Sequence, residues 1–392
     1  MDSPAAARSA VPVGVLSLAG GAAVANLYYC QPLLPQIGRD FALANGRVGL
    51  VSTAAQIGYA VGLLVFVPLG DVVERRRLIV SLLVAVSIAL AGCALAPGFG
   101  WLAAASFAVG LTTVVPQVVI PFAAALTPAE SRGRVVGRLM GALLIGILGA
   151  RVVAGAVGQV AGWRAMFAIA SALMLALAVA LWRMLAPSPP VATMPFGALL
   201  RSLVTLARAE PVVRDASAIG ALCFLAFSAF WTTLAFRLEL PPLHYGSTVA
   251  GLFGLVGVVG ASAAPLVGRF ADRSSPRSTV GIGLAGLAIS YVVFLLMGHT
   301  IAGLVVGVIL VDAAMQVVGV SNQARIYRLA AAAHSRLNTV YMVSYFAGGS
   351  VGSALGVWAW GLWRWTGVCV VAIAAVATAA ALYWRGRRTL PA

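Results

Sequence analysis

The chain has 392 residues, of which 61% are hydrophobic and only 9% are charged. A soluble domain of this length could not keep so much apolar surface out of water, so a soluble globular protein is excluded. The net charge of +16 comes from 26 basic residues, all arginine, against 10 acidic ones. These arginines lie in short polar breaks between long apolar stretches and form no single patch, so no nucleic-acid partner is expected.

Long apolar stretches recur along the whole chain and predict membrane-spanning helices. A helix of about 20 apolar residues crosses a bilayer. The stretches therefore predict an all-α, polytopic membrane protein with twelve transmembrane helices and no room for a separate soluble domain. The expected spans are 11–34, 48–70, 78–96, 101–126, 135–160, 165–185, 216–236, 248–268, 278–298, 301–323, 339–361 and 367–384.

The arginines are distributed unequally between alternate loops. With the N-terminus inside, 20 of them fall in the cytoplasmic tails and loops, 5 fall in the outer loops, and Arg151 lies within a span. Because cytoplasmic loops carry an excess of basic residues, we expect both termini to be cytoplasmic. The first span is too long for the apolar region of a cleaved signal peptide, so none is expected.

Three landmarks recur at a nearly constant offset and indicate an internal duplication. Asp71 corresponds to Asp272 at an offset of 201, and the Trp-Arg pair that begins at Trp163 corresponds to the pair at Trp363 at an offset of 200. The third pair is Arg132 and Arg336. Two six-helix halves of this kind place a substrate site at their interface near the bilayer midplane. The expected organisation is an N-terminal half at 1–186, a cytoplasmic central loop at 187–215 and a C-terminal half at 216–392.

The central loop begins with a proline cluster that cannot continue the sixth helix. The segment 199–203 after it is a candidate amphipathic helix on the inner leaflet, with a simple tether between the halves as the alternative.

Two loops in corresponding positions carry acidic and basic residues at a recurring spacing. The loop after the second span contains Asp71, Arg75 and Arg76, and the loop after the eighth contains Gly268, Asp272 and Arg273. This resembles the G-x-x-x-D-R-x-G-R-R loop of the major facilitator superfamily, although the first copy has Val67 and Glu74 at its glycine positions. The resemblance implies that each aspartate pairs with arginine at a helix end and acts as a latch for the inward-closed state. Charges that only set the topology are the alternative.

Two charges lie well inside predicted spans, Arg151 in the fifth and Asp312 in the tenth. A charge at the bilayer centre costs about 2.5–3.5 kcal/mol on insertion scales, so each faces protein or water and is a functional candidate. A partly desolvated carboxylate at Asp312 could bind and release a proton, and Arg151 could act on substrate or coupling. A structural ion pair between the two is the alternative.

Other polar and aromatic residues at membrane depth are candidates for a cavity lining. An amide or phenol facing lipid would leave a polar group unpaired, so these residues are expected to face inward. Each could instead hold helices together. In the superfamily that the chain resembles, helices 1, 4, 7 and 10 line the central cavity. The candidates are Asn26, Tyr29, Gln31, Gln56, Tyr59, Gln117, Trp231, Gln316, Asn322, Tyr341 and Tyr345.

The segments 26–32 and 312–342 closely resemble one bacterial branch of the superfamily, the arabinose-efflux-permease-like and purine-nucleoside-efflux-like drug:proton antiporters. The resemblance implies a multi-pass protein of the bacterial inner membrane that exports a small organic molecule in exchange for protons by alternating access. It differs from the antiporters in the fifth span, which is rich in glycine but lacks their proline. The alternative is an uptake symporter or uniporter for a sugar or small carboxylate. A membrane sensor that binds ligand without flux is a third hypothesis.

The sequence gives no sign of an enzyme. It has no phosphate-binding loop, and His244, His299 and His334 lie outside metal or triad spacing of suitable partners. No cofactor and no metal site are therefore expected. The four cysteines fall in or at the ends of spans and are expected to be packing residues. The expected partners are the lipid bilayer, a small-molecule substrate and protons, with the protein as a monomer.

Overall fold

The structure of the chain is a computed structural model that describes residues 12–188, 195–262, 276–329 and 334–389. Within these ranges the regular elements are helices, without a strand. In chain order they are α1 (Val13–Ala25), η1 (Gln31–Leu33), α2 (Leu34–Asp40), α3 (Asn45–Val48), α4 (Leu50–Val72), α5 (Arg75–Ala94), α6 (Phe99–Thr112), α7 (Val115–Leu126), α8 (Ala129–Met184), α9 (Phe196–Ala209), α10 (Pro211–Glu239), α11 (Ser247–Ser262), α13 (Pro276–Met297), α14 (Ile301–Tyr327) and α15 (His334–Thr389).

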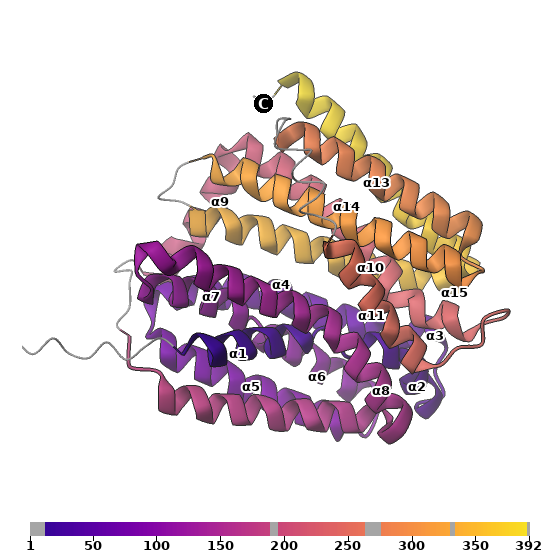
Figure 1. Cartoon of the computed structure of the whole chain (residues 1–392), viewed down its shortest axis with the longest axis horizontal. Helices are drawn as coiled ribbons and strands as arrows, with labels where there is room; N and C mark the ends of the chain where they lie inside the picture. Colours follow the sequence, from indigo (N-terminus) through magenta and orange to yellow (C-terminus); the bar gives the residue numbers. More distant parts are fainter. Residues whose placement is uncertain (1–11, 189–194, 263–275, 330–333, 390–392) are drawn as a thin grey trace, which may run out of the picture.

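The helices form two groups that lie against each other. Figure 1 shows α1 to α8 gathered in one group and α10 to α15 in the other. In the described part of the chain, eight helices are long and apolar enough to cross a membrane, and α1 and α11 are shorter apolar helices. An all-α membrane protein is therefore supported, whereas the count of twelve spans and the division at 186 and 216 stay predictions.

Two of the helices are too long to cross a bilayer once. α8 and α15 have 56 residues each, which at 1.5 Å per residue is about 84 Å, against a hydrocarbon core of about 30 Å. Each has a break in its backbone, at Gly162 (φ 80°) in α8 and at Trp363 and Arg364 (φ 52°) in α15. The positive φ at Gly162 is readily adopted because glycine has no Cβ. Both breaks lie in the gaps between predicted spans.

Two spans that we expected to be uninterrupted are broken in the structure. α1 ends at Ala25 and the next helical element begins at Gln31, and Thr113 and Val114 separate α6 from α7. Prolines follow both breaks, and proline disfavours a helical conformation at the residue before it. The breaks contact each other: Asn26 donates to the Thr113 hydroxyl at 3.1 Å, and that hydroxyl donates to the Ala23 carbonyl at 2.8 Å. The interrupted backbone is thus paired inside the protein.

The central loop contains the amphipathic helix that the sequence suggested. α9 covers residues 196–209, with Leu199 and Leu203 buried and Arg201 and Arg208 exposed. The helix that follows, α10, begins at Pro211. Proline is well accepted there because the first turn of a helix has no backbone acceptor for its N–H.

Candidate functional site

Charged residues mark the two ends of the helical groups. The outer end holds Asp40, Arg164 and Glu239, and the inner end holds Arg75 and Asp215; these names follow the orientation that the arginine distribution predicts. At the outer end, Asp40 accepts hydrogen bonds from the Trp163 indole at 2.7 Å and from Arg164 at 2.8 Å.

Arg151 lies at the centre of the candidate site, on the first part of α8 with 1% of its surface exposed. Its guanidinium carbon lies 3.9 Å from the centre of the Trp231 ring and 4.8 Å from that of Tyr28. Nε donates to the Gln31 side chain at 2.9 Å, and Nη1 donates to the Ile147 carbonyl at 3.2 Å. Nη2 is buried and has no hydrogen-bond partner in the described part of the chain.

Elements from both helical groups bring these contacts together. Tyr28 lies in the turn that follows α1, and Gln31 begins η1; both side chains contact Arg151 of α8. Trp231 comes from α10 in the other group. A cavity of only about 10 Å³ adjoins the guanidinium, which is room for roughly one water molecule. Its lining consists of Gln31, Pro32, Arg151, Trp231, Leu234, Ala235 and Ala250.

Asp312 is the second buried charge, on α14 with 6% of its surface exposed. Its Oδ2 atom is buried and accepts no hydrogen bond from the residues that the structure describes. No ion pair joins it to Arg151 within these ranges, so the structural pair that we considered is not formed in this arrangement. A buried carboxylate without a partner is costly while it is charged, which favours a protonated form or a partner that binds there.

A row of glycines on α11 separates Arg151 from Asp312. A Cβ atom added at Gly254 would lie 3.3 Å from the Cβ of Arg151, and one added at Gly257 would lie 3.4 Å from Oδ2 of Asp312. Gly251 and Gly260 continue the row at intervals of three residues, against the Arg151 carbonyl and the Asp312 Cβ. Small residues at this spacing let helices approach closely. We did not single out this row from the sequence, although its spacing is visible there.

Polar contacts join the two helical groups along the outer part of the interface. Gln56 on α4 donates to the Ser228 hydroxyl on α10 at 2.7 Å, and Thr53 donates to Ser353 on α15 at 3.0 Å. Further contacts are the Gln36–Ser247 hydrogen bond at 2.9 Å and the Arg39–Glu239 ion pair at 2.6 Å. These contacts hold the groups together at the outer end.

Several predicted lining residues lie in aromatic packing. Tyr59 packs on Phe346 with ring centres 4.3 Å apart, and Tyr345 stacks on Phe224 at 4.0 Å. The Tyr341 ring lies 5.9 Å from that of Tyr345, and its hydroxyl is buried without a hydrogen-bond partner in the described ranges. Among the remaining candidates, Tyr29 is buried and Gln117 and Gln316 are half-buried.

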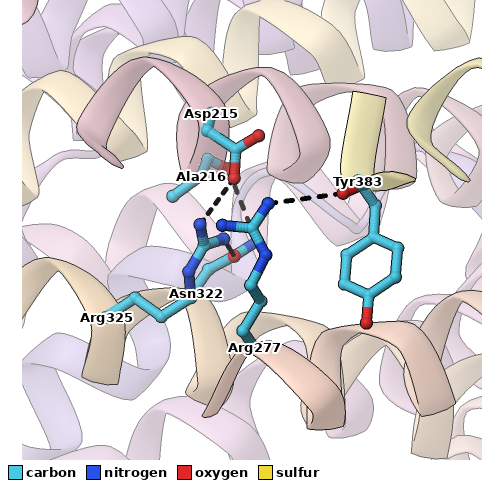
Figure 2. Close-up of polar contacts among 6 residues, drawn as sticks. All are labelled: Asp215, Ala216, Arg277, Asn322, Arg325 and Tyr383. Atoms are coloured by element: carbon cyan, nitrogen blue, oxygen red, sulfur yellow. Dashed lines mark hydrogen bonds and ion pairs between the residues drawn. The ribbon is translucent and has the colours of Figure 1, made fainter. Parts of the chain in front are cut away.

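Asn322 belongs to a different cluster, at the inner end. It lies ten residues after Asp312 on α14, about 15 Å along the helix. Figure 2 shows it among Asp215, Arg277 and Arg325. Arg325 forms an ion pair with Asp215 at 2.5 Å and donates to the Asn322 oxygen at 3.1 Å, and Asn322 donates to the Ala216 carbonyl at 3.4 Å. These contacts join Asn322 to the inner-end cluster, and its role in lining the central cavity stays a prediction.

The first predicted gating loop forms contacts within its own helical group. Asp71 pairs with Arg75 at 3.0 Å, and Arg75 also donates to the Gly70 carbonyl at 3.0 Å. Arg76 donates to the Trp182 carbonyl at 2.5 Å and lies over the Trp182 ring. These bonds tie the start of α5 to the ends of α4 and α8. The second loop, with Gly268, Asp272 and Arg273, lies outside the described residues.

Histidine, cysteine and acidic side chains are the usual protein ligands of a metal ion. The described part of the chain contains no group of three or more of these side chains that could hold one. The four cysteines are free and buried, as expected of packing residues.

Comparisons with known proteins cover almost the whole chain. A model of the Major Facilitator Superfamily matches residues 16–352. The chain is similar to "Uncharacterized transporter YgaY" of Escherichia coli, with 40% identity over 98% of both chains. It is also similar to "Probable transporter SCO4007" of Streptomyces coelicolor, with 38% identity over 94% of this chain and 86% of that one.

Solved structures show the same fold at low sequence identity. A bacterial homologue of the human lysosomal transporter Spinster, described as inward-facing and unoccupied, aligns with a TM-score of 0.77 and 16% identity over 98% of both chains. The POT family transporter PepTSo aligns with a TM-score of 0.72 and 14% identity over 97% of this chain and 98% of that one.

Proposed function

The chain belongs to the major facilitator superfamily, and from that premise we propose that it is a secondary transporter that exports a small organic molecule in exchange for protons. The observation that carries the proposal is the pair of buried charges, Arg151 and Asp312, on either side of the α11 glycines. Arg151 lies between the two helical groups, where such a fold places substrate, and Asp312 faces α11 within the second group. The resemblance to the arabinose-efflux-permease-like and purine-nucleoside-efflux-like branch supports export.

Alternating access follows from the arrangement of the two groups. In this structure the contacts of Gln56, Thr53 and Arg39 hold the outer end closed. We expect these bonds to break when the groups rock, which would open the site to the outside. With the predicted orientation, in which both termini are cytoplasmic, the closed face is the one directed away from the cytoplasm.

Asp312 is the proposed proton carrier. Its carboxylate is buried, and no described residue donates a hydrogen bond to Oδ2, so a proton would remove an uncompensated charge. A group of this kind binds a proton in one state of the transporter and releases it when the other state exposes it to water. The change of charge at Asp312 would alter the electrostatic energy of Arg151, which lies across the glycine row.

Uptake of a small carboxylate together with a proton is the second candidate. The specific observation in its favour is the unpartnered Nη2 of Arg151, since a buried arginine with a free donor suits an anion. Protonation of Asp312 would also remove a negative charge that competes with the anion for Arg151, so proton and substrate would bind together.

Proton movement in membrane vesicles tests the proposal. Inside-out vesicles with an acid lumen are challenged with dyes, nucleosides, sugars and carboxylates, using wild type and Asp312→Asn. We expect substrate to trigger proton efflux in wild type and not in the variant. Glu130→Gln, which changes an exposed acidic residue at the start of α8, is the control and should behave as wild type.

Two results would change the conclusion. Proton efflux that survives in Asp312→Asn would place coupling elsewhere. Substrate-driven proton entry into right-side-out vesicles, with substrate accumulating inside, would replace export by uptake.

A further inference from the structure

We propose that Arg151 and Trp231 bind the carboxylate group of the transported molecule. This inference rests on the proposed transport function and names the chemical class of its substrate. It holds for either direction of transport, because it concerns binding alone.

The guanidinium of Arg151 can accept a ligand only at its edge. Two aromatic rings lie close to its guanidinium carbon, Trp231 at 3.9 Å and Tyr28 at 4.8 Å. Along the edge, Nε is bonded to Gln31 and Nη1 to the Ile147 carbonyl. Nη2 is therefore the atom left for a ligand. Gln31 is a positioning residue, because its bond to Nε fixes the rotation of the guanidinium.

A second unused donor belongs to another residue of the same cavity, Trp231. The indole nitrogen of Trp231 is buried without a hydrogen-bond partner in the described ranges, as is Nη2 of Arg151. Both residues line the same small cavity. Leaving a buried donor unpaired costs about 1–3 kcal/mol, and more when it carries charge. A ligand that accepts from both atoms would remove that cost.

The charge of the cavity selects an anion. Its lining contains one arginine and no acidic side chain. A cationic group would meet the uncompensated charge of Arg151 in a place with little water to screen it. A planar carboxylate instead matches the in-plane donors of a guanidinium, and its second oxygen can accept from an indole N–H.

The volume of the cavity shows which state would hold the ligand. Room for about one water molecule is enough for an oxygen atom and not for a whole substrate. The remainder of the molecule would need space created when the helical groups part. The described arrangement is thus a closed form of the site.

Binding to the purified full-length transporter in lipid nanodiscs tests the proposal. The probes are pairs of equal size that differ in charge: benzoate with benzamide, and succinate, citrate and glutarate with their amides. A ligand that binds the folded protein raises its melting temperature. We expect at least one acid to stabilise wild type while its amide, at equal concentration, does not.

Variants assign the effect to the two donors. Trp231→Phe keeps an aromatic ring over the guanidinium but removes the indole N–H, and should weaken acid binding about tenfold, the value of one hydrogen bond to a charged group. Arg151→Gln should abolish it. Arg151→Lys keeps the charge without the planar edge and should weaken it by at least as much as Trp231→Phe. Arg47→Gln, an exposed arginine at the outer end, is the matched control.

The outcomes separate this inference from the proposed function. Three results would each overturn the carboxylate site. They are acid binding that is unchanged in Trp231→Phe and Arg151→Lys, equal binding of acid and amide, and no binding of any acid by wild type. If Arg151→Gln does not fold, Trp231→Phe and the comparison of acid with amide still decide. Charge-selective binding without proton-coupled flux would uphold the carboxylate site and overturn the transport mechanism instead.

Discussion

The ion pair between Asp215 and Arg325 should contribute strongly to the stability of the C-terminal helices, and Asp215→Asn tests this. The two side chains are only 10% and 6% exposed, and their charged atoms are 2.5 Å apart. Figure 2 shows Arg277 directed toward the same carboxylate, with its Nη2 donating to the Tyr383 carbonyl at 3.3 Å. Loss of the negative charge would leave two buried guanidinium groups facing a neutral amide.

The expected cost can be worked out from these contacts. Removing one partner of a buried ion pair costs about 3–5 kcal/mol. The new amide can still accept one hydrogen bond, worth about 1 kcal/mol, so we expect the lower end, near 3 kcal/mol. With an unfolding entropy of about 2.1 cal/mol/K per residue over 392 residues, this lowers the melting temperature by about 4 °C. Membrane helices that persist after unfolding would make the shift larger.

A thiol-reactive fluorogenic dye provides the assay. Cys30, Cys93, Cys223 and Cys369 are all free and buried, so they react only when the protein unfolds. The control is Arg77→Gln, which breaks the ion pair between Arg77 and Glu74. Because the Arg77 side chain is 79% exposed, this change should lower the free energy of unfolding by less than about 1 kcal/mol. The double variant Asp215→Asn/Arg325→Gln should recover part of the loss, because both charges are gone. A shift for Asp215→Asn no larger than the control, or additive losses in the double variant, would refute the reasoning.

Two further changes test the helix interface and the central loop. Gly251→Leu would drive a side chain into the Arg151 carbonyl and should prevent closure at the outer end. We expect the variant to lose transport, and a cysteine introduced into it by Ser247→Cys to react with an impermeant maleimide. Gly361→Leu, at a glycine with open space around it, is the control and should have no effect. If Ser247→Cys stays unreactive, the glycine row does not set the closure. Leu203→Asp buries a charge under α9 and should speed trypsin cleavage at Arg201 and Arg208 at least several-fold. Thr205→Asp, at an exposed position of the same helix, is the control. Equal cleavage of the two variants would show that α9 is not held by its apolar face.

The sequence alone was sufficient for the class of protein and for its isolated charges. Repeated apolar runs of bilayer length are typical of membrane-spanning helices, and a charge inside such a run stands out, so Arg151 and Asp312 were found without a structure. The amphipathic segment before α10 was recognised for the same kind of reason. These features depend only on residues that are close together in the sequence, so the spacing along the chain is enough to predict them.

Only the tertiary structure could assign partners. Asp215 had been counted as the end of the central loop, yet it pairs with Arg325, 110 residues away in sequence, and draws Asn322 into the same cluster. Gln31 of η1 and Trp231 of α10 meet Arg151 because the packing of these elements brings them there. The role of the α11 glycines became visible only when the structure showed that they pack against Arg151 on α8 and Asp312 on α14. Each of these contacts depends on which helix faces come together, and the spacing of residues along one helix does not contain that information.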